Sequence, residues 1–282
     1  MCSIERNSLD TRYLETLLEV VEGGSLAAAG RRQNITAAAV GQRLKALEQE
    51  LGTRLVARSG ATVRPTSACL RMLPRLQSIL SETRRLQSDV AEDGLAGPYR
   101  LGVISTGLSD YVPSLVTHLP ELAPDVELVI TPGSSTQLYD MVSRADLDAA
   151  ILVEPHFQIP KTLAIQHLNT QPFAWVTPTE PATADLPLVV YDRTSWGGEI
   201  AWRWIEQQAT VPQVLCEMDS PETVASLVAS GVARAVLPIW ASLAGMSGIN
   251  IHSIEELTPR SIVFVHRGTP IDRVCVGVMR GG

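Results

Sequence analysis

The sequence predicts a two-part protein, with a small helical module first and a larger α/β part after it. Up to about residue 93, apolar residues recur at three- and four-residue steps, the period of amphipathic helices. From residue 99 onward, short apolar runs alternate with helical patterns, which indicates parallel sheets covered by helices. The segment Asp93–Pro98, rich in Gly and Pro, separates these patterns and is predicted to be a linker. A length of 282 residues suits two units of about 100–200 residues each.

The helical module has the parts of a helix-turn-helix. Two short helices, a tight turn and a longer helix with one apolar stripe follow one another. The expected pieces are a first helix capped by Ser8 and ending at Gly23-Gly24, a second over Leu26–Gln33 capped by Ser25, a turn at Asn34-Ile35, and a third from its cap Thr36 to Gly52 with its stripe at Val40, Leu44, Leu47 and Leu51.

A two-stranded wing is predicted next, with strands over Leu55–Arg58 and Thr62–Arg64 around a Ser59-Gly60 turn. Thr66 then caps a long helix to about Asp93, which Pro74 should kink or break. The apolar residues of this helix approximate a heptad seam, and a second copy of the chain is the simplest partner for it. The seam comprises Leu70, Leu73, Leu76, Leu80, Leu86 and Val90.

The second part alternates strands with helices. Its expected strands are Tyr99–Ile104, Val126–Ile130, Asp148–Val153, Ala164–Leu168, Phe173–Thr177, Leu188–Tyr191, Gln213–Glu217, Arg234–Leu237 and Ile262–His266. Its expected helices are Leu108–Leu119, Thr136–Arg144, Ser195–Ala209 and Pro221–Ser230.

Charge is distributed unevenly along the chain. The net charge is −7, yet residues 25–75 hold nine basic and two acidic residues and carry +7, whereas residues 94–282 carry −9. A basic module of this kind can bind phosphates locally, while the acidic part limits non-specific association. A well-solvated basic surface with no ligand is the alternative interpretation.

Several classes of protein are disfavoured. Apolar residues make up 45% of the chain, but no stretch approaches the about 18 uncharged apolar residues of a membrane span, and the N-terminus lacks the pattern of a secretory signal. The cysteines at positions 2, 69, 216 and 275 have no redox or metal spacing. No catalytic motif such as GxSxG, HExxH or a phosphate loop is present. We therefore expect a cytoplasmic protein that is not an enzyme and has no cofactor or metal.

The first part resembles the LysR family of bacterial transcription regulators. Gly24-Ser25-Leu26 with the following alanines is similar to its GSxxxAA segment, and Leu47-Glu48 through Leu51-Gly52 to its LExxLG. Thr66 stands where that family begins its linker helix. The chain departs from the family on its DNA-reading face, with Ala37, Ala38 and Gly41 where most members have Gln, Pro and Ser.

The second part resembles the effector domain of that family. Asp146–Ile151 is similar to its GxLDxAI, and Leu227–Gly231 with Ala235–Pro238 to its VxxGxGxxxLP. The resemblance implies an α/β sensor of two Rossmann-like lobes, as in periplasmic binding proteins, behind a winged helix-turn-helix and a long linker helix. The implied parts are the DNA-binding domain at 1–66, the linker and dimerisation helix at 67–96, and the effector domain at 97–282, with lobe I at about 97–169 and 262–282 and lobe II at about 170–261.

DNA contacts are expected from the third helix and its surroundings. Gln42 and Lys45 lie opposite the apolar stripe, so they can face a groove, and Arg43 can touch phosphate. Arg58 is either a phosphate contact or a structural partner of Glu48 or Glu50. The full set of expected DNA-binding residues is Arg31, Arg32, Thr36, Ala37, Ala38, Gln42, Arg43, Lys45, Arg58 and Arg64.

Effector contacts are expected where strands end and helices begin, because helix N-termini offer unpaired N–H groups. Hydroxyl and N–H groups there favour a small anion or polar metabolite, and ordinary helix capping is the alternative for any single serine. The candidates are Ser105, Thr106, Ser134, Ser135, Glu154, Arg193, Trp196 and Ser220.

These observations predict a DNA-binding regulator that a small molecule controls. The expected partners are double-stranded DNA, the effector, RNA polymerase and a further copy of the chain in a dimer through residues 67–93. The family resemblance also implies a tetramer. A ligand-independent repressor and a solute-binding protein are the alternatives. The second would carry an export signal and no basic helix-turn-helix.

Overall fold

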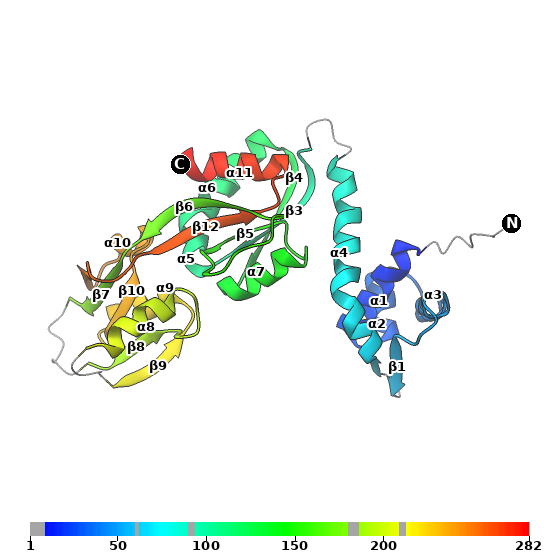
Figure 1. Ribbon diagram of the computed structural model, residues 1–282, viewed down its shortest axis with the longest axis horizontal. Coiled ribbons are helices and arrows are strands. Elements are labelled where there is room, and N and C mark those ends of the chain that lie inside the picture. Colours follow the sequence, from blue (N-terminus) through cyan, green and yellow to red (C-terminus); the bar gives the residue numbers. More distant parts are fainter. Residues whose placement is uncertain (1–8, 60–61, 90–93, 180–185, 209–212, 282) are drawn as a thin grey trace. The chain divides into compact units, whose positions relative to one another are not determined.

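The computed structural model describes residues 9–59, 62–89, 94–179, 186–208 and 213–281, and it divides into two compact units, Met1–Leu86 and Gln87–Gly282 (Figure 1). No helix in the described ranges is long and apolar enough to cross a membrane. The elements of the first unit are α1 (Thr11–Gly23), α2 (Leu26–Arg32), α3 (Ala37–Glu50), β1 (Val56–Ser59), β2 (Thr62–Pro65) and α4 (Ser67–Asp89), the last of which continues into the second unit.

The predicted caps explain most helix boundaries of the first unit. The hydroxyls of Ser25, Thr36 and Thr66 each accept a backbone N–H three residues on, at 3.1–3.2 Å. Ser8 lies outside the described residues, and its predicted role is wrong because Asp10 caps α1, accepting the N–H of Arg12 at 2.9 Å.

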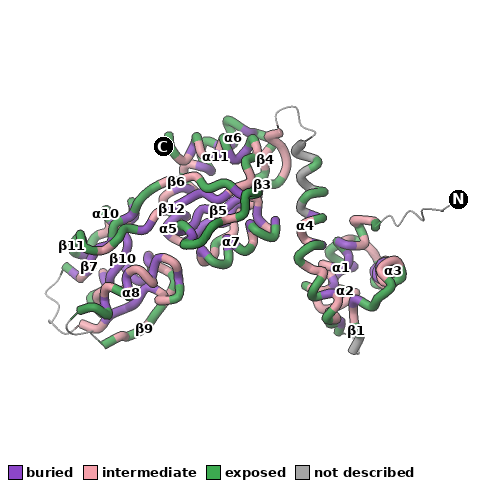
Figure 2. Tube along the Cα trace, viewed as in Figure 1, coloured by how far each residue is buried: buried purple, intermediate pink, exposed green. Residues whose placement is uncertain are grey.

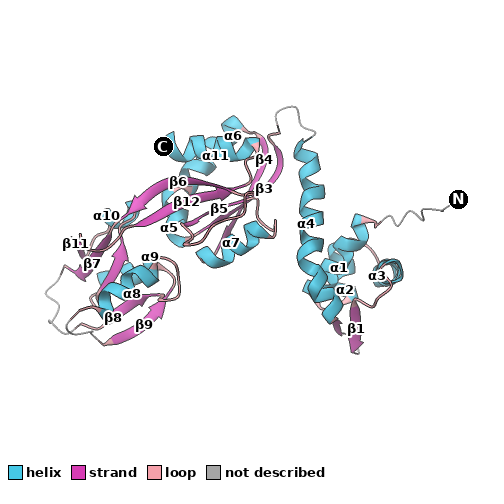
Figure 3. Ribbon diagram, viewed as in Figure 1, coloured by secondary structure: helices cyan, strands magenta, loops and turns pink. Residues whose placement is uncertain are grey.

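Pro74 was predicted to kink or break this helix, and α4 is continuous through it, so the break is absent (Figure 3). A proline inside a helix removes the hydrogen bond to the carbonyl four residues earlier, here that of Leu70. The part of the expected helix beyond Asp89, including Val90, lies outside the described residues.

The apolar stripe of α4 completes the core of its own unit. Leu76 and Leu80 are 1% and 2% exposed and belong to the same cluster as Leu17 of α1 and Leu47 of α3. Leu76 and Leu80 were predicted to face a second copy, and that prediction is wrong, because both are buried in the core that α4 forms with α1 and α3.

A different face of α4 carries exposed apolar residues. Ile79 and Leu86 are 46% and 60% exposed and lie seven residues apart, which places them two turns apart on one side of the helix. Leu70 is also exposed, whereas Leu73 is half-buried against the core.

Lobe I of the second unit is built on a five-stranded sheet. Its strand order is β4-β3-β5-β12-β6, with β3 parallel to β4 and β5, and β12 antiparallel to β5 and β6. α6 and α11 lie together on one face and α7 on the other, and Figure 2 shows β5 and β12 buried between them. The elements are β3 (Ala96–Val103), α5 (Ser105–Asp110), α6 (Val112–Leu122), β4 (Asp125–Pro132), α7 (Ser135–Ser143), β5 (Ala149–Val153), β6 (Ala164–Gln171), β12 (Arg260–His266) and α11 (Pro270–Gly281).

Lobe II has helices on both faces of its strands. Val189 and Tyr191 of β8 pack with α9, while the alternate residues Leu188 and Val190 pack with α8. The parallel pair β8-β9 joins the antiparallel sheet β10-β7-β11 through a hydrogen bond from Val189 N to Arg234 O. The elements are β7 (Phe173–Pro178), β8 (Leu188–Tyr191), α8 (Gly198–Glu206), β9 (Val214–Met218), α9 (Pro221–Ala229), β10 (Ala235–Pro238), α10 (Ala241–Ala244) and β11 (Ile249–Ser253).

Two segments carry the chain between the lobes. β6 leads out of lobe I through Gln171 into β7, and β12 returns from lobe II beginning at Arg260 (Figure 1). Because β12 runs against its neighbours, the sheet of lobe I is mixed rather than purely parallel.

Three local expectations differ from the structure. The predicted helix Leu108–Leu119 is two helices, and Pro113 lies in the first turn of the second, a position that favours a new start. The predicted linker ends early, since Ala96 already pairs with Asp125 of β4. α10, β11 and α11 were not predicted.

Candidate nucleic-acid interface and effector site

α3 presents one polar and open face. Ala37, Ala38, Gln42 and Lys45 are exposed, whereas Val40 on the opposite side is fully buried. The approach to this helix is tight: a Cβ on Gly30 would lie 2.7 Å from the carbonyl oxygen of Ile35. α3 therefore begins directly out of the turn, with its N-terminal residues open to a ligand.

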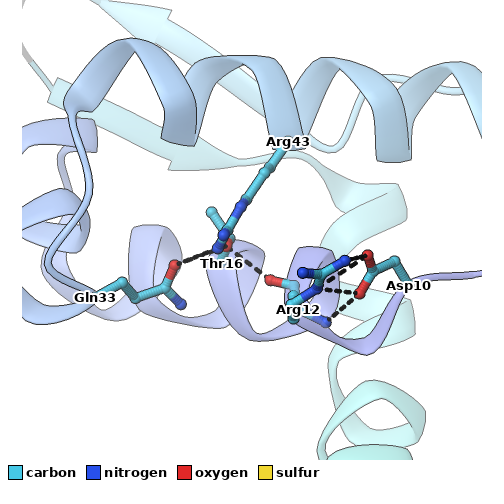
Figure 4. A network of polar contacts seen from close by, with 5 residues as sticks. All are labelled: Asp10, Arg12, Thr16, Gln33 and Arg43. Carbon is cyan, nitrogen blue, oxygen red and sulfur yellow. Dashed lines mark hydrogen bonds and ion pairs between the residues drawn. The ribbon is translucent and has the colours of Figure 1, made fainter.

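Arg43 is held inside the helix-turn-helix (Figure 4). Its Nη1 donates to Thr16 Oγ1 and to Gln33 Oε1, each at 3.2 Å, and Thr16 is fully buried. The guanidinium thus joins α1, the end of α2 and α3. We leave Arg43 out of the proposed DNA contacts, because these two bonds hold its Nη1 against α1 and the end of α2.

The other basic candidates differ in their surroundings. Arg31 and Arg64 are exposed. Arg32 is paired with Glu19 at 2.8 Å, which ties α2 to α1 and reduces the charge it offers to a phosphate. Arg58 lies in β1, but its side chain is outside the described residues.

Glu48 has a structural role that the sequence reading missed. Its Oε1 accepts the backbone N–H groups of Leu55 at 2.8 Å and Val56 at 3.1 Å, which anchors the start of the wing to α3.

Three of the predicted effector residues act in local structure. Ser134 caps α7 in a reciprocal box with Gln137, and Ser220 caps α9 by accepting from Thr223 N at 3.4 Å. Ser135 Oγ accepts from Val153 N at 3.1 Å, which fastens α7 to the end of β5. The capping alternative therefore describes Ser134 and Ser220 in this structure.

Thr106 lies at the meeting point of the two lobes. It is 1% exposed in the first turn of α5, and its Oγ1 accepts from Arg260 Nη2 at 2.9 Å. Arg260 is equally buried, and it also donates from Nη1 to the hydroxyl of Tyr191, in lobe II, at 3.1 Å. Ser105 precedes Thr106 and is half-buried.

Gln171 extends this arrangement toward a carboxylate. Its Oε1 accepts from Arg260 Nε at 2.9 Å, and its Nε2 donates to Asp110 Oδ2 at 3.4 Å. The same Asp110 oxygen accepts from Ala241 N of lobe II. Burial raises the pKa of the Asp110 carboxyl, although N–H groups of α10 and the charge of Arg260 oppose this. We call Thr106, Gln171, Tyr191 and Arg260 the interlobe cluster.

Trp196 of lobe II packs against aromatic residues of lobe I. Its ring centroid lies 5.6 Å from that of Phe157 and 6.0 Å from that of Tyr139, both on lobe I. Tyr139 and Phe157 meet edge to face at 5.0 Å. This aromatic group is a second contact between the lobes.

Arg193 and Glu154 stand apart from the interlobe cluster in their contacts. Arg193 pairs with Glu217 at 3.3 Å, and its guanidinium carbon lies 4.1 Å from the ring centroid of Trp202. Both partners belong to lobe II, so Arg193 braces that lobe. Glu154 is exposed at the end of β5.

Sequence reasoning missed Arg260, Gln171, Tyr191 and Asp110. One signal was available, since Arg260 is a lone cation two positions before the apolar run Ile262–Val265, where burial is expected. Gln171 and Tyr191 occupy strand ends and Asp110 ends a helix, positions that sequence periodicity does not distinguish.

Family models match both units. The model of the bacterial regulatory helix-turn-helix proteins of the lysR family matches residues 11–70, and the model of the LysR substrate-binding domain matches residues 92–269.

Individual relatives match nearly the whole chain. The HTH-type transcriptional regulator IlvR of Caulobacter vibrioides is 26% identical over 265 residues, which is 89% of each chain. CbbR of Cereibacter sphaeroides is 28% identical and covers 84% of this chain and 80% of its own.

Solved structures share the fold. A full-length OxyR variant from Pseudomonas aeruginosa matches with a TM-score of 0.71 at 22% identity, covering 97% of this chain and 95% of its own. CbnR in complex with its target DNA matches with a TM-score of 0.66 at 17% identity, covering 97% and 99%.

Proposed function

This chain belongs to the LysR family of bacterial transcription regulators, and we propose that a small polar or anionic effector between its lobes controls how it binds or activates promoters. It is a DNA-binding regulator with an effector-binding domain. The observation that most supports control through the lobes is the buried interlobe cluster, in which side chains from both lobes meet at the two crossing segments. We propose that the chain acts as a regulator and not as an enzyme, in keeping with this family.

The proposed DNA contacts lie on the exposed face of α3 and beside it. Gln42 is long enough to reach a base edge, and an amide can bind adenine through two hydrogen bonds. The methyl groups of Ala37 and Ala38 can contact thymine methyls but cannot hydrogen-bond. Arg31, Lys45 and Arg64 supply positive charge for phosphates, and the +7 of residues 25–75 supports this assignment.

Self-association is proposed through the outer face of α4. Ile79 and Leu86 offer apolar area that the described residues of the unit leave exposed, and a second copy of the helix would cover it. A tetramer through the effector domains, contact with RNA polymerase and a cytoplasmic location remain parts of this proposal.

Replacement of Gln42 by alanine is expected to weaken specific DNA binding by about ten- to a hundredfold, the usual loss when a two-bond base contact disappears. The measurement is fluorescence anisotropy of the full-length protein on a duplex from its own upstream region. Gln49→Ala is the matched control, because Gln49 is exposed at the other end of the same helix. Equal losses in both variants, or none for Gln42→Ala, would contradict the proposed reading face.

A ligand-independent repressor is the second candidate. It predicts that no small molecule changes the affinity for that duplex, whereas the effector proposal predicts a shift for the compound that stabilises the protein. An effector can change the affinity only through different affinities for the two lobe arrangements.

A further inference from the structure

Arg260 is a buried cation whose hydrogen-bond partners among the described residues are all neutral. Its guanidinium donates to an amide oxygen and two hydroxyls, those of Gln171, Tyr191 and Thr106, and the residue is 1% exposed. Among the residues that the structure describes, no carboxylate oxygen lies within ion-pair distance of it. Burying a charge without an opposite charge in contact is costly, so this position calls for a specific reason.

Two acidic side chains, Asp110 and Asp219, feel the charge of Arg260 without forming an ion pair with it. Gln171 lies between the guanidinium and Asp110, and it uses its oxygen for the first and its nitrogen for the second. Burial raises the pKa of both carboxyl groups, and neither of them contacts the guanidinium. The positive charge of Arg260 is therefore only partly balanced by the protein.

The guanidinium retains donors for a ligand. It carries five N–H groups, and three of them account for its hydrogen bonds to the described residues. A carboxylate takes two parallel N–H bonds from such a fork. The Thr106 hydroxyl accepts from Arg260, so its own hydrogen is available to donate to the same anion.

We propose that Arg260 is the anion-recognising residue of the effector site and that the effector carries a carboxylate or a comparable oxyanion. This inference rests on the proposed function, because it assigns the ligand chemistry of that same cleft. Arg260 holds Thr106 of lobe I and Tyr191 of lobe II at once. An anion that accepts hydrogen bonds from this guanidinium changes its contacts with both lobes. Binding of the anion therefore favours one lobe arrangement over another.

Thermal unfolding of the full-length protein tests the proposal. The probes are sodium salts of mono-, di- and tricarboxylates with two to eight carbons, inorganic phosphate and sulfate, at constant ionic strength, with the amide of each carboxylate as its uncharged match. At least one anion should raise the melting temperature while its uncharged match does not. Arg260→Gln should weaken its apparent affinity at least about tenfold, the scale of a charge-assisted hydrogen bond.

Arg260→Lys keeps the charge but loses the planar fork, so it should also weaken the anion at least about tenfold. If circular dichroism shows that Arg260→Gln is unfolded, the affinity of Arg260→Lys for the anion is the deciding measurement. Arg203→Gln is the control and should bind the anion as wild type does, because Arg203 is a highly exposed cation on α8.

The proposal is overturned if no anion stabilises the protein, or if Arg260→Lys binds the stabilising anion with unchanged affinity. An uncharged compound that loses affinity in Thr106→Val but keeps it in Arg260→Lys would also overturn it. That last result would contradict the anion proposal but would still support an effector site between the lobes. The proposed function itself would be contradicted by a different result, namely DNA binding that neither Gln42→Ala nor any stabilising compound changes.

Discussion

Replacing Leu76 by aspartate is expected to unfold the N-terminal unit. Leu76 is 1% exposed in the core that α4 forms with α1 and α3, so the new carboxylate would be buried without a partner. Loss of the leucine contacts together with a buried charge costs about 4 kcal/mol or more, a large part of the stability of a small unit. The measurement is chemical denaturation followed by circular dichroism, together with loss of DNA binding.

Ile79→Asp is the matched variant three residues away on the same helix. Ile79 is 46% exposed, so the unit should stay folded while the sedimentation coefficient shifts toward that of the monomer. If Leu76→Asp is folded and monomeric while Ile79→Asp sediments as wild type does, the faces of α4 are assigned the wrong way round.

Asp272→Asn is expected to destabilise the effector domain by about 2–4 kcal/mol at neutral pH, since it weakens buried hydrogen bonds to a charged acceptor. Asp272 is fully buried and accepts from Tyr99 Oη at 2.5 Å and Thr269 N at 2.8 Å, and it pairs with His266 at 3.3 Å. An asparagine can accept through only one atom, so its NH₂ group would face one of these donors.

The effect of Asp272→Asn should depend on pH. Burial raises the pKa of Asp272, but hydrogen bonds from His266, Tyr99 and Thr269 outweigh it and hold the pKa below its usual value of 3.8. A carboxyl group with a lowered folded-state pKa stabilises the fold above its unfolded pKa and loses that contribution as the pH falls through the folded value. The stability gap between wild type and the variant should therefore be full at pH 7 and shrink below about pH 4.

Urea denaturation over that pH range measures this gap. Asp140→Asn is the control, because Asp140 is exposed on α7 and its replacement should change stability by less than about 0.5 kcal/mol. A gap that is constant from pH 7 to pH 3 would show that the charge of Asp272 does not stabilise the fold.

Local chemistry explains what the sequence could predict. The caps at Ser25, Thr36 and Thr66 depend on a side chain and an N–H group three residues away, so they are legible in the chain itself. The stripe Val40, Leu44 and Leu47 follows in the same way from helical spacing, and all three residues are buried in the structure.

Contacts between distant segments explain what the sequence could not predict. Arg260 meets Thr106, 154 positions away, and Gln171, 89 positions away, and no periodicity carries that information. The sequence showed that α4 has an apolar stripe, but it did not show what the stripe packs against. Leu76 was therefore assigned to a second copy of the chain, although it packs against α1 and α3.

The predicted effector residues illustrate the same limit. Sequence placed hydroxyls at the starts of helices, where ligand binding and capping require the same residue types. Ser134 and Ser220 cap their helices, whereas Thr106 contacts the buried guanidinium of Arg260, a residue far from it in the sequence. Only the tertiary structure separates the two cases.

The salt dependence of DNA affinity tests the central claim, that the basic N-terminal unit of this chain binds duplex DNA. The measurement is fluorescence anisotropy of the full-length protein on its own upstream duplex in a salt series. If about six phosphates are neutralised, the affinity should fall about a thousandfold between about 50 and 200 mM salt, because counterions are released in proportion to those phosphates. An affinity that stays constant across that series would contradict the account.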